Sequence, residues 1–115
     1  DPIFLSSIRR ILARRGHKVT TLEDSRRVIE AIPDVAPDLA LIDVAMPEKD
    51  GFQVAREIRD EYRGLIPVVM LTGRTSAADE ASAYRHGAAA FLTKPLDPDE
   101  LFDAVDSFTE TKRRF

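Results

Sequence analysis

The chain has 115 residues, and its 17 Lys and Arg against 20 Asp and Glu give a formal net charge of −3. That length predicts one domain, and a hydrophobic content of 43% excludes a disordered or collagen-like chain. Cysteine is absent, which excludes disulfide frameworks, thiolate zinc sites and cysteine nucleophiles. The mild acidity argues against direct binding of nucleic acid by this domain.

The sequence carries no membrane or export signal. No apolar run approaches the roughly 18 residues that a membrane-spanning helix requires, and the N-terminus lacks the charged and apolar regions of a signal peptide. We therefore expect a cytoplasmic protein with no membrane partner.

The first part of the chain predicts a helix, a strand and a second helix. Apolar residues at helical spacing predict a helix over residues 2–15. The short β-branched run 18–22 predicts a strand. Either Asp24 or Ser25 can cap a helix that continues through Ile32.

The middle of the chain repeats this alternation. Pro33 and Pro37 predict a loop, after which residues 39–42 form a continuous apolar run. A continuous run is typical of a strand that is covered on both faces. A helical stripe over residues 51–62 precedes a second buried strand over 68–71.

The last part adds one more strand between two helices. An alanine-rich segment from Thr75 to His86 predicts a helix, residues 90–92 predict a strand, and the capping sequence that begins at Asp97 predicts a helix to about Phe108 or beyond. Alternating strands and helices with short connections indicate a mostly parallel sheet with helices on both faces. Because the pattern opens on a helix, the repeating unit also predicts a strand before residue 1.

Three polar residues directly follow the predicted buried strands. Asp43 ends the run 39–42, Thr72 ends the run 68–71, and Lys94 follows the last strand. In open α/β sheets, ligands bind beyond the carboxyl ends of the strands. A carboxylate, a hydroxyl and an ammonium gathered at that edge suit phosphoryl chemistry on Asp43.

With these residues in these positions, the sequence resembles the receiver domain of a two-component response regulator. The resemblance covers nearly the whole length of the chain. The resemblance rests on LALIDVAMPEKDG, PVVMLTG and GAAAFLTKP, in that order and spacing, at residues 39–51, 67–73 and 87–95. It implies a flavodoxin-like three-layer α/β sandwich with a parallel sheet of order 2-1-3-4-5. The first strand, which in this family ends in two adjacent acids, is absent from the sequence, so we expect residues upstream. Residues 1–108 are predicted to be the receiver domain, and residues 109–115 the end of the last helix or the start of a linker.

The resemblance also implies roles for single residues. Asp43 would accept a phosphoryl group from a phosphohistidine, and Thr72 and Lys94 would bind phosphoryl oxygens. Asp43, the backbone carbonyl of Ala45 and the upstream acid pair would hold Mg²⁺. Thr72 and Phe91 would be the switch residues that change the face formed by the fourth helix, the last strand and the last helix.

Further expectations concern rate and partners. The positions of Ala45 and Arg74, two residues after Asp43 and Thr72, influence in this family how water reaches the acyl phosphate. The implied partners are a histidine kinase or histidine phosphotransfer protein, an output domain or effector protein, and a second copy of the chain in a homodimer. The domain would be no enzyme in its own right, although it promotes its own phosphorylation and dephosphorylation.

Two other functions are compatible with parts of the pattern. A receiver-like module that binds proteins without being phosphorylated would explain the absent acid pair. A phosphatase of the haloacid dehalogenase type also uses an acceptor aspartate, but it requires a second Asp two residues later, where Ala45 stands. The sequence also contains no glycine-rich Walker loop for nucleotide phosphates.

Overall fold

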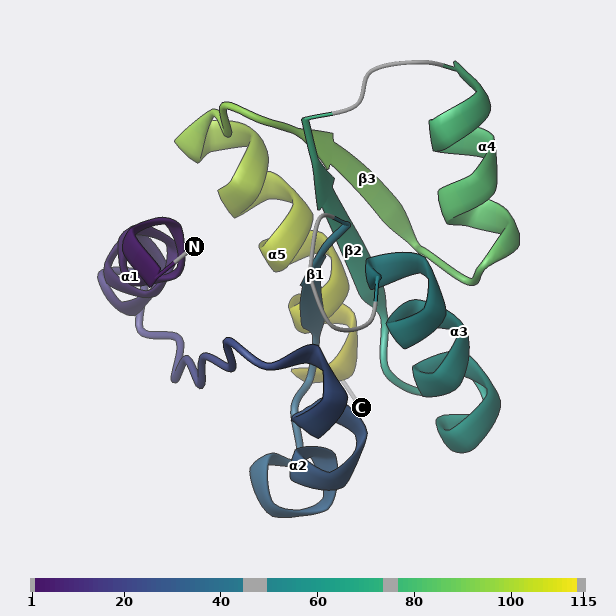
Figure 1. The fold of residues 1–115 in the computed structure, drawn as a ribbon. Coiled ribbons are helices and arrows are strands. Elements are labelled where there is room, and N and C mark those ends of the chain that lie inside the picture. Colours follow the sequence, from purple (N-terminus) through teal and green to yellow (C-terminus); the bar gives the residue numbers. More distant parts are fainter. Residues whose placement is uncertain (1, 45–49, 74–76, 114–115) are drawn as a thin grey trace.

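Three parallel strands lie at the centre of the molecule (Figure 1). The computed structural model describes residues 2–44, 50–73 and 77–113. The strands β1 (Ala40–Asp43), β2 (Val68–Thr72) and β3 (Ala90–Thr93) pair in the order β1-β2-β3. Because consecutive parallel strands lie side by side, all their carboxyl ends meet at one edge of the sheet.

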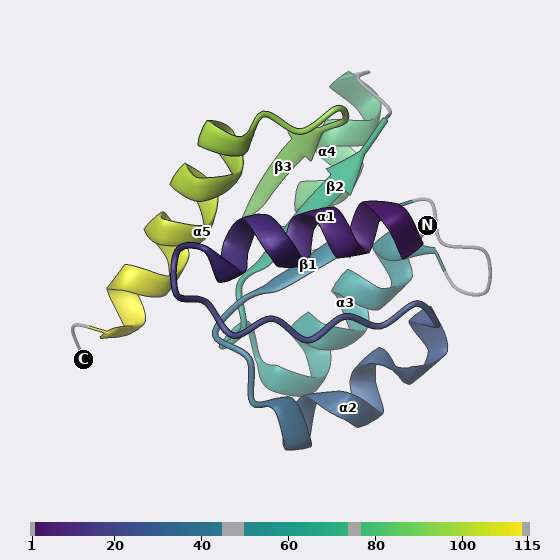
Figure 2. The same ribbon diagram turned by 90° about the vertical axis from the view of Figure 1, so that its left-hand side faces the viewer.

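Helices cover both faces of the sheet, which makes three layers (Figures 1 and 2). On one face lie α1 and α5, and on the other lie α2, α3 and α4. A 3₁₀ turn, η1, precedes α2. The bounds are α1 (Pro2–Ala13), η1 (Ser25–Arg27), α2 (Val28–Val35), α3 (Gly51–Tyr62), α4 (Ala77–Arg85) and α5 (Pro98–Arg113).

Side chains of β2 form the centre of both hydrophobic layers. Val68 and Met70 belong to the α3-side layer, the hydrophobic cluster between the sheet and α2, α3 and α4. Val69 and Leu71 belong to the cluster on the other face, between the sheet and α1 and α5. All four are at most 2% exposed, and each such burial contributes about 1.5–3 kcal/mol. Burial on both faces explains why this strand is apolar at every position instead of every second one.

The predicted strand over residues 18–22 is wrong, because within the described residues this segment belongs to no strand. Its side chains still contribute to the core, since Val19 packs against the α1 and α5 layer. A strand exists only where a neighbour accepts its backbone hydrogen bonds. Among the described strands, β1 is the edge on this side, and it pairs with β2 alone.

The loop predicted at Pro33 is also wrong, because Pro33 lies inside α2. The helix continues to Val35, and Ala36 then adopts the left-handed conformation, with its N–H donating to the carbonyl of Ile32 at 2.7 Å. A proline this close to the end of a helix removes one intrahelical donor and leaves little of the helix beyond it.

The other helices and strands predicted within the sequence are confirmed, with ends that differ by a few residues. The last helix, α5, continues through residues 109–113, beyond Phe108. No helix in the described ranges is long and apolar enough to cross a membrane.

Asp24 caps the η1 turn and is held by Arg26. Its carboxylate accepts the Arg26 backbone N–H at 2.9 Å and both the Nε and Nη2 donors of the guanidinium at 3.0 and 2.9 Å. The side-chain hydrogen bonds to Arg26, followed by the backbone one, lower the pKa of Asp24 from 3.8 to about 2.

We expect the Asp24 carboxyl resonance to titrate with a midpoint near 2, and with a higher midpoint, still below 3.8, in Arg26→Gln, which loses the guanidinium but keeps the backbone hydrogen bond. Since folding lowers this pKa, the stability that Asp24 contributes is complete above the unfolded value and is lost as pH falls through the folded one. NMR titration of the two proteins measures both midpoints. Equal midpoints would contradict the side-chain hydrogen bonds from Arg26 to Asp24.

Candidate functional site

The register of the sheet brings together the three polar residues that follow the strands. Asp43 lies opposite Leu71, and Thr72 lies opposite Thr93. The Lys94 N–H donates to the Thr72 carbonyl at 2.7 Å, which continues the ladder one step beyond β3. Asp43, Thr72 and Lys94 therefore lie at the same edge of the sheet, at the ends of three adjacent strands.

Asp43 and Lys94 form an ion pair across this edge. Lys94 Nζ donates to Asp43 Oδ2 at 2.7 Å, and the two side chains are 29% and 16% exposed, respectively. Partial burial limits the screening of this pair by water, while the remaining exposure leaves both groups within reach of a ligand. A carboxylate oxygen beside a fixed ammonium is suited to attack an anionic phosphorus centre.

The predicted switch residues lie on the other face of the sheet from the ion pair. Alternation along β2 places Thr72 on the face of Val68 and Met70, and Phe91 packs into the same α3-side layer. Thr72 is 2% exposed and Phe91 is half-buried. Thr72 thus lies at the carboxyl edge of the sheet, and its side chain faces the α3-side layer that contains Phe91.

The start of α3 is packed directly against the strand that ends in Asp43. Asp50 caps α3 by accepting the N–H of Gln53 at 2.9 Å, and the N–H of Gly51 donates to the Val44 carbonyl at 3.2 Å. A Cβ on Gly51 would lie 2.8 Å from Val44 Cα and would also collide with the Asp43 carbonyl oxygen. In the sequence, Gly51 stands out only as the first residue of the helical stripe 51–62 and, with Asp50, as the end of the motif at 39–51.

Phe4 also lies at this edge of the sheet, beside Lys94. Its ring lies under the Lys94 ammonium, 4.3 Å from Nζ to the ring centroid. Phe4 belongs to α1, far from Lys94 in the sequence, and its spacing in α1 reads only as that of a core residue. No sequence signal predicts this contact.

Some predicted site residues cannot be placed. Ala45 and Arg74 lie outside the described residues, so their predicted metal-binding and rate-tuning roles stay predictions. Within the described ranges, no group of three or more His, Cys, Asp or Glu could hold a metal ion by itself. A metal at this edge would therefore rely on Asp43 together with groups beyond those ranges, water or phosphate oxygens.

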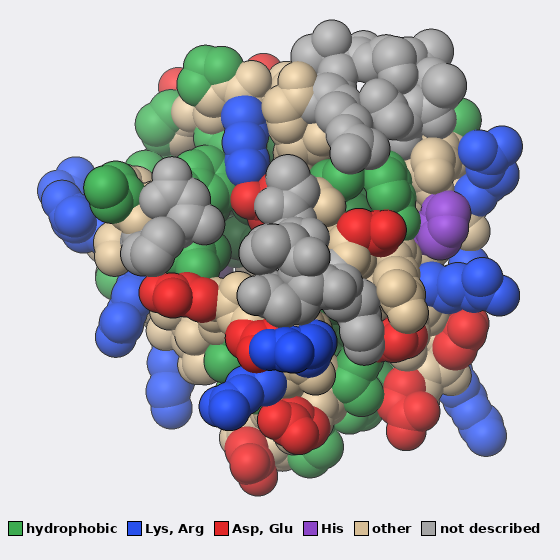
Figure 3. All heavy atoms as spheres, in the orientation of Figure 1, with side chains coloured by type: hydrophobic (Ala, Val, Ile, Leu, Met, Phe, Trp, Pro, Cys, Tyr) green, Lys and Arg blue, Asp and Glu red, His purple; other side chains and the backbone are tan. Residues whose placement is uncertain are grey.

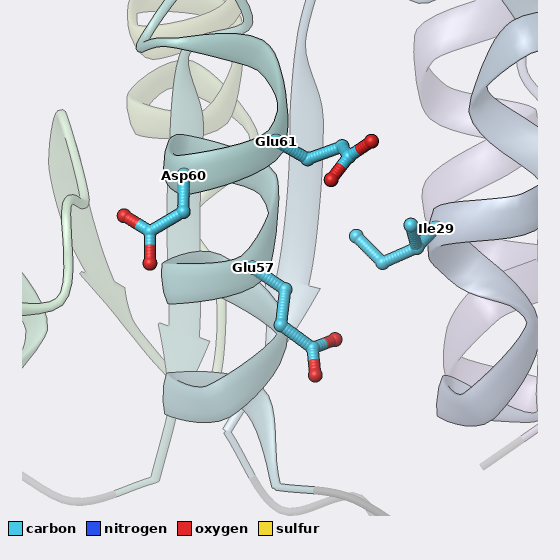
Figure 4. Close-up of a pocket in the computed structure, with 4 residues that line it drawn as sticks. All are labelled: Ile29, Glu57, Asp60 and Glu61. Carbon is cyan, nitrogen blue, oxygen red and sulfur yellow. The ribbon is translucent and has the colours of Figure 1, made fainter.

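A hollow of about 370 Å³ lies elsewhere, between α2 and α3 (Figure 4). Glu57, Asp60 and Glu61 on α3 and Ile29 on α2 line it. It contains none of the strand-end residues, and acidic side chains alone identify no ligand.

On the face shown in Figure 3, described Lys and Arg side chains are interspersed with Asp and Glu.

Residues 1–106 match the family model described as the response regulator receiver domain. The chain is a response regulator receiver domain. Receiver domains act in two-component systems with histidine kinases and output domains, and they generally bind Mg²⁺ in an acidic pocket.

Curated relatives agree with this family. The receiver domain is 36% identical over 102 residues to the transcriptional regulatory protein TcrA of Mycobacterium tuberculosis, which covers 89% of this chain and 40% of TcrA. It is 36% identical over 105 residues to the DNA-binding transcriptional regulator NtrC of Escherichia coli, covering 88% of this chain and 22% of NtrC. The chain thus spans two-fifths or less of these relatives.

Solved structures show the same fold. The N-terminal receiver domain of Klebsiella pneumoniae RstA, in its BeF3-activated form, superposes with a TM-score of 0.88 at 28% identity, covering 95% of this chain and 92% of that one. A CheY-like receiver domain protein of Methanospirillum hungatei superposes with a TM-score of 0.89 at 23% identity, covering 99% and 90%. The expected flavodoxin-like α/β fold is confirmed.

Proposed function

We propose that this receiver domain accepts a phosphoryl group on Asp43 from a phosphohistidine of a histidine kinase or a histidine phosphotransfer protein. The observation that supports it is the 2.7 Å pair of Asp43 and Lys94 at the carboxyl edge of the sheet. Thr72, at the end of the neighbouring strand, is the second phosphoryl-binding residue. A cytoplasmic location and an output domain or effector partner belong to the same proposal.

In the transfer, an Asp43 carboxylate oxygen attacks phosphorus while the phosphorus–nitrogen bond to imidazole breaks. The imidazole takes up a proton as it leaves, and the product is an acyl phosphate on Asp43. Lys94 offsets the repulsion between the carboxylate and the incoming phosphoryl oxygens, and the Thr72 hydroxyl donates a hydrogen bond to one of those oxygens. Catalysis of this kind consists mainly of positioning and charge compensation.

The Asp43 carboxylate is the type of oxygen donor that Mg²⁺ prefers, and Mg²⁺ is usually bound by one or two carboxylates together with waters and phosphate oxygens. In this proposal, Asp43 and the Ala45 backbone carbonyl would hold the ion, with an acid pair upstream of this sequence. When bound, the ion supplies positive charge that stabilises the transferring phosphoryl group.

Mass-spectrometric mapping tests the acceptor. After incubation with acetyl phosphate and Mg²⁺, we expect a phosphoryl group that alkali and hydroxylamine remove, as they remove an acyl phosphate, on the peptide that contains Asp43. Labelling on a different residue, or a hydroxylamine-resistant phosphate, would overturn the proposal.

Phosphorylation is also proposed to change the face formed by α4, β3 and α5. Movement of the Thr72 hydroxyl toward the phosphoryl group would release space in the α3-side layer, where Phe91 packs. We expect beryllofluoride with Mg²⁺ to shift amide resonances on β3 and on the described parts of α4 and α5, and to shift them much less in Phe91→Leu. Unchanged resonances on this face in the parent protein would count against the switch.

A further inference from the structure

The ammonium of Lys94 has a contact besides its ion pair with Asp43. Its Nζ lies 4.3 Å above the centroid of the Phe4 ring and 2.7 Å from Asp43 Oδ2. A cation within about 6 Å of an aromatic ring centroid is attracted by the negative face of that ring. The same ammonium is therefore held from one side by the proposed acceptor and from another by α1.

A lysine in this position needs such a restraint. Its four-carbon stem has many rotamers, and Lys94 follows the end of β3. Beside it lies a cavity of about 480 Å³ between α1 and α5, lined by Phe4, Ser7, Ile8, Lys94, Pro95 and Leu101 among others. The cavity is mostly apolar, and Phe4 is the aromatic residue in its lining. Without the ring, the stem of Lys94 gains room to turn toward this space.

α1 holds Phe4 in a defined place. Ile8 and Leu12 of α1 are 6% and 4% exposed and pack with Leu101 and Val105 of α5, while Phe4 itself is half-buried at the edge of the same layer. The helix is thus anchored by its buried residues, one and two turns beyond the ring. Because Phe4 contacts Lys94, the position of α1 affects the position of the Lys94 ammonium beside Asp43.

We propose that Phe4 is a positioning residue for Lys94: its ring face keeps the ammonium beside Asp43 and thereby sets the efficiency with which Asp43 takes up a phosphoryl group. The inference rests on the proposed function of Asp43. Phe4 contacts neither the phosphoryl donor nor Asp43 in this scheme, and it acts through Lys94 alone.

The test compares four substitutions. Phe4→Leu removes the ring face and keeps an apolar side chain, whereas Phe4→Tyr keeps the face. Phe102→Leu is the matched control, because the Phe102 ring also carries a cation, Arg15, at 4.0 Å from its centroid and belongs to the same hydrophobic layer. Lys94→Met gives the rate without the ammonium.

Two measurements are made on the parent protein and on the Phe4 and Phe102 variants, and only the second is made on Lys94→Met. The first is the chemical shift of the Lys94 ε-methylene protons, which the ring current of Phe4 moves upfield. The second is the rate of Asp43 phosphorylation by acetyl phosphate with Mg²⁺. For Phe4→Leu we expect the ε-methylene shift to return toward that of an ordinary lysine, and the rate to fall about two- to fivefold, as loss of a partly exposed cation–π contact predicts. Phe4→Tyr and Phe102→Leu should keep both the shift and the rate of the parent.

Other outcomes separate this inference from the proposed function. A parent protein that is phosphorylated on Asp43, with Phe4→Leu at the parent rate, overturns the positioning role alone. Equal losses in Phe4→Leu and Phe102→Leu also overturn it, because they indicate a general packing defect. If the parent is not phosphorylated but its Lys94 protons move in Phe4→Leu, the acceptor proposal fails and the contact between ring and ammonium stands.

Discussion

Asp43→Asn is expected to abolish phosphoryl uptake from acetyl phosphate in the presence of Mg²⁺. An amide has nearly the shape of a carboxylate, but it is neutral and its oxygen is a very weak nucleophile, so no acyl phosphate forms. The substitution also removes the charge that Lys94 pairs with at 2.7 Å. Because Lys94 is 29% exposed, water can solvate its ammonium, and we expect the free energy of unfolding to change by only about 1 kcal/mol. Phosphate-affinity electrophoresis measures the loss.

Asp50→Asn is the matched control for this prediction. Asp50 follows the strand end of Asp43 by a few residues, but its carboxylate caps α3 through the N–H of Gln53. Asparagine caps helices about as well as aspartate, so this variant should keep its fold and its labelling. Labelling of Asp43→Asn at the parent level would sink the assignment of the acceptor. Loss of labelling in both variants would show that the assay responds to any acid in this region.

Gly51→Ala is expected to lower the free energy of unfolding by about 3 kcal/mol, through steric overlap at the start of α3. The added Cβ would collide with the Asp43 carbonyl oxygen and would lie 2.8 Å from Val44 Cα and 2.9 Å from the Asp43 carbonyl carbon. All three are backbone atoms, so no side-chain rotation relieves the overlap, and α3 must move away from β1. Val54, Ala55 and Ile58 of α3 are fully buried, so such a movement would open the core. Chemical denaturation monitored by circular dichroism measures the change.

Gly73→Ala provides the comparison for Gly51→Ala. A Cβ on Gly73 meets nothing within 4 Å, and Gly73 is exposed. We expect this variant to unfold within about 0.5 kcal/mol of the parent protein. Equal stability of the Gly51 and Gly73 variants would show that the approach of α3 to β1 is not as close as the structure has it.

The buried strands and the site residues that follow them were predictable, because their signals are local. Residues 68–71 are apolar at every position, and a run of this kind is stable only when both faces of the strand are covered. The polar residues Asp43 and Thr72 interrupt two such runs at the edge where a parallel sheet exposes its strand ends. Pro98 and the acids after it predicted the start of α5 equally well.

Pairing and contact between distant segments were not predictable in the same way. Residues 18–22 have the composition of a strand, yet within the described residues they form none, because strand formation needs a backbone neighbour and not only β-branched side chains. Proline is typical of loops, yet Pro33 lies inside α2. Ile32 and other residues of α2 pack against α3, which stabilises the helix around Pro33.

Periodicity and strand-end chemistry, which are properties of neighbouring residues, were therefore enough to predict the fold class and the residues that meet at the carboxyl edge of the sheet. The family was predicted from the resemblance of three motifs. The tertiary structure alone decided that Lys94 pairs with Asp43 at 2.7 Å, that Phe4 lies against the same ammonium, and that Gly51 leaves no room for a side chain. Each of these contacts joins two different elements of the structure. The distance across each contact depends on how the helices and strands pack together. Local propensity contains no information about that packing.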